Sequence, residues 1–103
     1  MAREPRPLTR GRPLPRPFNM HWGSGMITEE ATYEGEYHCP TIQLLEYTEG
    51  EAAGSFSVRF CYYSHDGRYQ RSPLMVGDDE LDGLRDALQD SPKLREILRR
   101  LVE

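Results

Sequence analysis

Few side chains in this chain of 103 residues are spaced for metal binding. The candidate ligands, carboxylates aside, are three histidines and two cysteines: His21, His38, Cys39, Cys61 and His65. A zinc site needs about four convergent ligands, which usually come in close pairs such as CxxC or HxxxH. The one close pair here is His38-Cys39, and neighbouring side chains of an extended segment point to opposite sides. We expect no metal site and no other cofactor.

Nucleophilic catalysis has one candidate, the thiol of Cys61 with His65 or His38 as its base. A cysteine in the middle of a strand is more often a small packing residue than an activated thiol. The acidic groups at 34–36 and 78–80 have no partner pattern that names a reaction, and the second suits a helix start. The sequence contains no P-loop, GxGxxG or GxSxG motif. We expect no enzymatic activity, and no small-molecule substrate is evident.

The segment 55–63 has the alternation of a β-strand. We call the side formed by Phe56, Val58, Phe60 and Tyr62 the Phe60 face, and the side formed by Ser57, Arg59, Cys61 and Tyr63 the Arg59 face. Because the Phe60 face is the more apolar, we expect it to be the core, with the Arg59 face left free for contacts.

A hairpin follows, because Asp66-Gly67 favours the positive φ of a tight turn. The return strand is expected over 68–76. A loop of two or four residues would place Tyr69, Arg71, Pro73 and Met75 on the Phe60 face. Pro73 lacks an amide donor, which predicts an edge strand or a strand end.

Arg59, Tyr63 and Arg68, with Arg71 at the edge, are the candidate contact residues. Exposed aromatic side chains beside arginine on a sheet can hold single-stranded nucleic acid without reading its sequence. The same face could instead pack against a second protomer or against residues 18–40, which would also explain Cys61. Both interpretations remain open at the level of the sequence.

The other elements complete an α+β domain. A strand is predicted over 41–47, and the irregular segment 18–40 predicts one short strand or an ordered loop. One helix should begin at Gly77-Asp78, and a second at Ser91 with Pro92 in its first turn. The apolar stripe of the first helix is Leu81, Leu84 and Leu88. That of the second is Leu94, Ile97, Leu98 and Leu101. We expect an antiparallel sheet of three to four strands with two C-terminal helices packed on one face.

Composition and charge divide the chain into an N-terminal arm and one domain. Residues 1–19 read as a disordered, basic, Pro- and Arg-rich arm, and residues 20–103 as a single domain. The arm could be a solvated tail, an extension before a true start at Met20 or Met26, or a segment that touches nucleic acid or an acidic surface. The formal net charge is -4, and no apolar run approaches the length of a membrane span. No secretory signal is recognisable, so we expect a cytoplasmic protein with reduced cysteines.

The block VRFCYYSHDGRYQRSPLMVGDDELDGLRDAL, within residues 55–90, resembles the single-stranded-DNA-binding coactivators of the positive cofactor four family. The shared features are a strand of the V-R-x-x-Y-Y kind, a polar glycine turn, a basic return strand and a helix with an acidic start. The resemblance implies a dimer that binds single strands through its sheet, with contacts from Arg59, Tyr63, Arg68 and Arg71.

Together these features predict a small non-catalytic interaction or regulatory protein. It would act through an exposed sheet face and self-associate as a homodimer. The alternative is a transcriptional regulator that binds single-stranded nucleic acid.

Overall fold

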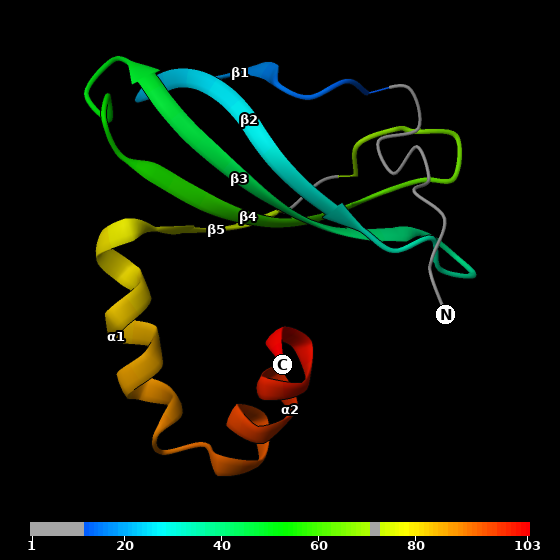
Figure 1. Ribbon diagram of the computed structural model, residues 1–103, viewed down its shortest axis with the longest axis vertical. Coiled ribbons are helices and arrows are strands. Elements are labelled where there is room, and N and C mark those ends of the chain that lie inside the picture. Colours follow the sequence, from blue (N-terminus) through cyan, green and yellow to red (C-terminus); the bar gives the residue numbers. More distant parts are fainter. Residues whose placement is uncertain (1–11, 71–72) are drawn as a thin grey trace.

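A computed structural model describes residues 12–70 and 73–103, and within them the chain alternates between strands and turns before ending in two helices (Figure 1). The strands are β1 (Arg16–Met20), β2 (Gly23–Thr32), β3 (Cys39–Glu49), β4 (Phe56–Tyr63) and β5 (Leu74–Gly77). They form one antiparallel sheet in chain order. The helices are α1 (Asp78–Leu88) and α2 (Pro92–Val102). The expected α+β class is confirmed, with five strands where three to four were expected.

The additional strands, β1 and β2, lie mostly within the segment 18–40, whose sequence pattern is irregular. β1 and β2 form a hairpin, with Phe18 of β1 opposite Gly25 of β2. A Cβ on Gly25 would lie 1.9 Å from the carbonyl oxygen of Glu46, so the absence of a side chain lets β2 approach β3 closely at a register shift. Residues 16–19, expected to belong to the mobile arm, are therefore part of the sheet. Residues 1–11 of that arm lie outside the described residues.

The sheet is curled, so that strands distant in its order meet across its inner side. Arg16 of β1 donates a hydrogen bond of 3.3 Å to the hydroxyl of Tyr63 on β4. Phe18 packs edge-on against Tyr47 of β3, with ring centroids 5.0 Å apart. The apolar part of this interior consists of Phe18, Ile27, Leu45 and Tyr47, with Met20, Ala52 and Met75 around them.

The expected assignment of faces on β4 is wrong. Arg59 and Tyr63 are only 8% and 5% exposed, whereas Phe60 and Tyr62 are 38% and 40% exposed. Ser57 pairs with Leu45 and Arg59 pairs with Gln43, so the Arg59 face shares its side of the sheet with the core residues of β3. The curl closes over this side, and its polar groups find partners there.

The expected loop length of the hairpin is also wrong. The loop holds three residues instead of two or four. The Ser64 amide donates to the Arg68 carbonyl at 2.8 Å, and Tyr63 bridges to Tyr69. Gly67, at a φ of 89°, takes the left-handed position of such a loop. An odd loop puts Tyr69 on the Arg59 face, and Met75 also joins it by pairing with Arg59. β5 is an edge strand, and it is shorter than the predicted return strand.

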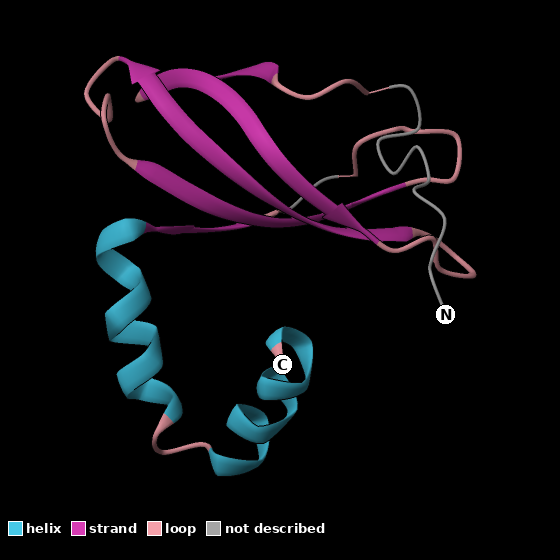
Figure 2. Ribbon diagram, viewed as in Figure 1, coloured by secondary structure: helices cyan, strands magenta, loops and turns pink. Residues whose placement is uncertain are grey.

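Both helices begin where the sequence predicts. The Gly77 amide donates to the Glu80 carboxylate at 2.8 Å, which closes the first turn of α1, and Pro92 opens α2. Both helices lie on one side of the sheet (Figure 2). No residue within Asp78–Leu88 or Pro92–Val102 is buried, so they flank that side without packing tightly against it.

Candidate functional site

The inner side of the sheet holds a group of polar residues from four strands and the segment before β1. We call it the interior polar cluster, and its members are Arg12, Arg16, Glu30, Gln43, Arg59 and Tyr63.

Gln43 is the centre of this cluster and is 1% exposed. Its Oε1 accepts a hydrogen bond of 2.7 Å from Nε of Arg59. Its Nε2 donates to Glu30 at 2.6 Å and to the Tyr63 hydroxyl at 2.9 Å. One amide therefore joins three strands, which is why a glutamine can be buried in the middle of β3.

Glu30 and Arg16 form a fork-shaped ion pair across β1 and β2. The Nη1–Oε1 and Nη2–Oε2 distances are 3.3 Å and 2.8 Å, and the Glu30 side chain is 0% exposed. Burial raises the pKa of Glu30, but hydrogen bonds from Arg16 and Gln43, together with nearby positive charge, outweigh it and hold the pKa below its usual value. Burial lowers the pKa of Arg16, but its hydrogen bonds and charge interactions with Glu30 and Tyr63 outweigh burial, so the pKa is raised above its ordinary value.

Arg12 completes the cluster as a stacked cation. Its Cζ lies 3.7 Å from the centroid of the Tyr63 ring, and its Nη2 is 3.8 Å from Oε2 of Glu30. The Tyr63 ring meets Tyr69 at 5.5 Å, and Arg59 lies over Tyr69 at 4.9 Å. The cluster thus holds three arginines and one carboxylate.

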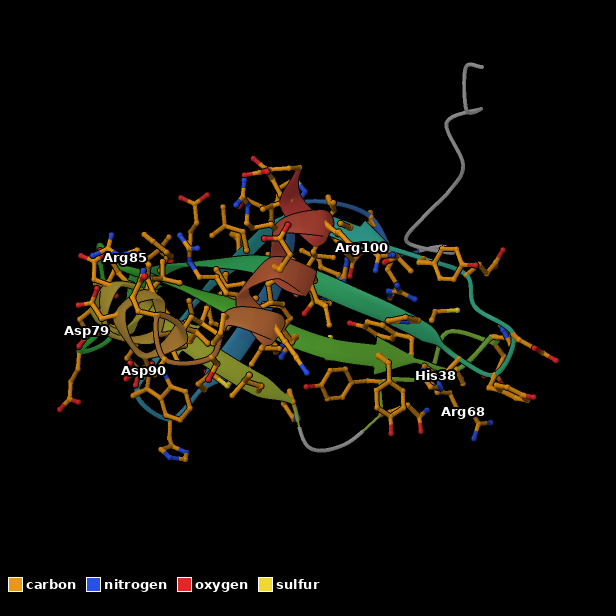
Figure 3. The ribbon with its side chains drawn as sticks, turned by 90° about the horizontal axis from the view of Figure 1, so that it is seen from below. His38, Arg68, Asp79, Arg85, Asp90 and Arg100 are labelled. Carbon is orange, nitrogen blue, oxygen red and sulfur yellow. The ribbon has the colours of Figure 1, made fainter. Side chains whose placement is uncertain are left out.

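The structure separates the four predicted contact residues. Arg59 and Tyr63 lie together, but inside the sheet. Arg68 sits at the exposed end of the β4–β5 hairpin, 3.6 Å from Asp66, with its side chain 82% exposed (Figure 3). Arg71 lies outside the described residues.

Sequence reasoning missed four members of the cluster: Arg12, Arg16, Glu30 and Gln43. The available signal was Gln43, a lone amide among the apolar residues of a strand, since such a group needs a buried partner. The identity of that partner depends on the curl.

The thiols lie on the same inner side. Cys39 is buried and Cys61 is partly buried, and both are free. Burial raises the pKa of the Cys61 thiol, so it is less ionised at neutral pH than an ordinary cysteine. Within residues 12–70 and 73–103, no three His, Cys, Asp or Glu side chains are grouped to hold a metal ion.

The outer side of the sheet is apolar. The Phe60 face continues onto β3 and β5 through pairs such as Ile42 with Phe60 and Phe60 with Leu74. A cavity of about 600 Å³ lies between this side and Leu101 of α2, with Ile42, Phe60 and Tyr62 in its wall. We call this side, together with the stripes of the two helices, the outer apolar surface.

The helices add exposed apolar groups and opposite charges to this surface. Six stripe residues are at least 37% exposed: Leu81, Leu84, Leu94, Ile97, Leu98 and Leu101. α1 carries five acidic residues and one arginine, while α2 carries four basic residues and one glutamate. Figure 3 shows α2 with Arg100 in front of the sheet, and Asp79 and Asp90 at the end where α1 lies.

Comparisons with protein-family models, with curated proteins and with solved structures find no match for this chain. The resemblance to the positive cofactor four family stays a prediction. In the described part of the chain, neither helix has the length and apolar character needed to span a membrane.

Proposed function

We propose that this chain is a non-catalytic interaction protein that works as a homodimer through the outer apolar surface. The observation that supports this most directly is that the apolar stripes of both helices are exposed. Ile97 and Leu101 on α2 are each 57% exposed, although Leu101 faces the sheet across the cavity.

Helices of this length need a packing partner. α1 and α2 have 11 residues each, and isolated helices of that length are marginal in water. Fully burying one leucine or isoleucine side chain contributes about 1.5–3 kcal/mol, so covering even part of the stripes would stabilise an assembly substantially. The helices would therefore be stabilised by association.

Charge complementarity favours a second copy as the partner. An acidic α1 repels another α1 and attracts a basic α2. In a dimer with twofold symmetry, α1 of each protomer would pack on α2 of its partner, so the favourable contact occurs twice. The outer side of the sheet would then be covered by the same contact.

Single-stranded nucleic acid is the weaker alternative. Two of its four expected contacts, Arg59 and Tyr63, are buried, so bases could reach them only if the sheet opened. Stacking needs an exposed aromatic surface beside the arginines.

Analytical ultracentrifugation over a wide concentration range tests the proposal. We expect a concentration-dependent dimer that Ile97→Glu weakens at least about tenfold, because a charge would be buried in the contact. Arg99→Gln is the matched control, since it changes the net charge by the same amount at a side chain that is 51% exposed and lies on the helix face opposite the leucine stripe. A monomer at every concentration would contradict the proposal.

A charge exchange tests the pairing of the helices. Asp82→Lys on α1 and Arg95→Glu on α2 should each weaken the dimer. Combining the two should restore it, because the complementarity is recreated with its sign reversed. Equal, additive losses would show that the helices do not pair in this way.

A further inference from the structure

Counting only the part of the chain that the structure describes, the interior polar cluster holds more positive charge than negative charge. Glu30 is its one carboxylate, and Arg12, Arg16 and Arg59 are its cations. The oxygens of Glu30 already accept two hydrogen bonds from Arg16 and one from Gln43. The nearest atom of Arg12 lies 3.8 Å from Glu30, which is too long for a hydrogen bond.

Arg12 is the unsatisfied member. Its Nε, Nη1 and Nη2 atoms are buried, and none of them has a hydrogen-bond partner among residues 12–70 and 73–103. An arginine does not lose its charge in proteins, so it cannot relieve this by deprotonation. A buried guanidinium without acceptors is costly, and an anion that supplies oxygen atoms would remove that cost.

The surroundings of Arg12 suit an oxyanion. Its guanidinium lies over the Tyr63 ring at 3.7 Å, which holds the plane of its donors. A fixed planar fork matches the paired oxygen atoms of carboxylate and phosphate groups. Arg59 supplies a second positive charge beyond the Tyr63–Tyr69 pair.

Access is from the end of the sheet where the chain enters β1. The Arg12 side chain is 14% exposed and that of Arg16 is 16% exposed. Because the Arg12 donors are buried, a ligand has to displace the groups that cover them. Only a small ligand, or the anionic end of a larger one, would fit among these side chains.

We propose that this end of the interior polar cluster is a binding site for a small oxyanion, held by the guanidinium of Arg12 with Arg59 as the second charge. The site lies on the inner side of the sheet, whereas the proposed dimer contact lies on the outer side. Loss of one therefore does not imply loss of the other.

Titration calorimetry of the full chain tests the site, with inorganic phosphate and acetate as separate probes at constant ionic strength. We expect saturable binding of at least one probe and a matching rise in melting temperature, because a ligand that binds the folded state stabilises it. If phosphate binds more tightly than acetate, the site prefers a tetrahedral oxyanion. If acetate binds more tightly, it prefers a carboxylate.

Arg12→Gln should weaken binding at least tenfold while the protein remains folded, because the substitution removes the guanidinium whose donors have no hydrogen-bond acceptors in the described part of the chain. Arg68→Gln is the matched control, since it removes an exposed arginine outside the cluster. Arg59→Gln should weaken binding less than Arg12→Gln. The proposal is overturned if neither probe binds saturably, if Arg12→Gln binds like the original protein, or if Arg68→Gln loses binding equally.

Discussion

Glu30 accepts hydrogen bonds from Arg16 and Gln43 inside the curled sheet, and its negative charge lets polar residues of several strands be buried together. Breaking a buried pair by removing one partner costs more than the pair itself contributes, because the other charge stays desolvated. At the scale of single residues, the stability of the interior thus depends on one carboxylate.

Glu30→Gln should lower the free energy of unfolding by about 3–5 kcal/mol at neutral pH, measured by urea denaturation, because it leaves Arg16 without its anion. Glu29→Gln is the matched control on the same strand, and its effect should stay within about 0.5 kcal/mol because Glu29 is exposed. Equal effects at the two positions would contradict the role assigned to Glu30.

The ionised carboxylate of Glu30 should also make the stability of the protein depend on pH. Because the pKa of Glu30 is lowered by folding, its contribution is complete above its ordinary pKa of 4.5 and is lost as the pH falls through the lower folded value. Urea midpoints measured from pH 7 downwards should therefore fall more steeply for the original protein than for Glu30→Gln. Parallel curves would contradict the lowered pKa.

Cys61 should be a slow thiol. Its pKa is raised by burial, so the reactive thiolate is scarce at neutral pH. We expect Cys61 in a Cys39→Ser variant to react with a thiol probe at least about tenfold more slowly when folded than when unfolded in urea. A rate above that of the unfolded chain would revive a catalytic interpretation.

At the scale of elements, the ends of helices and strands follow local rules, but their faces do not. The starts of α1 and α2 were predicted from Gly77 and from Ser91-Pro92, where the deciding residues are neighbours in sequence. The side on which Tyr69 lies depends on whether the hairpin loop has an odd or an even number of residues. The Asp-Gly pair alone does not determine that number.

Substituting alanine for Gly25 in β2 and for Gly83 in α1 tests the close approach of β2 to β3. Gly25→Ala should destabilise the protein by several kcal/mol, because its Cβ would lie 1.9 Å from a backbone oxygen that cannot move without breaking β2 from β3. Gly83→Ala should stabilise α1 by up to about 1 kcal/mol, since nothing lies within 4 Å of its Cβ and alanine favours the helix. Thermal unfolding of both variants measures the contrast, and equal signs would contradict the close approach at Gly25.

At the scale of the whole molecule, the sheet protects a polar and apolar interior while the helices leave their stripes open. A protein that associates through those stripes should be more stable at higher concentration, because dimerisation favours the folded state. We expect the melting temperature to rise with protein concentration for the original chain and for Arg99→Gln, and to rise less for Ile97→Glu. Differential scanning calorimetry over a hundredfold concentration range measures this.

Two of the six residues of the interior polar cluster could be anticipated from the sequence. Arg59 and Tyr63 were recognised as a pair because they alternate on one strand, and they do lie together. Their partners could not be found, since Arg16, Glu30 and Gln43 come from three other strands and meet only through the curl. The register shift near Glu29 also alters which residues of β2 point inward.

The sequence by itself determined the α+β class, the helix starts and the pairing of β4 with a return strand, because caps, periodicity and turn residues act over a few neighbouring positions. Only the tertiary structure decided which side of the sheet became the interior. The inner side holds the apolar core of Phe18, Ile27, Leu45 and Tyr47 as well as polar groups that hydrogen-bond across strands, and both are brought together by the curl. Phe60 and Tyr62 on the other side were left exposed.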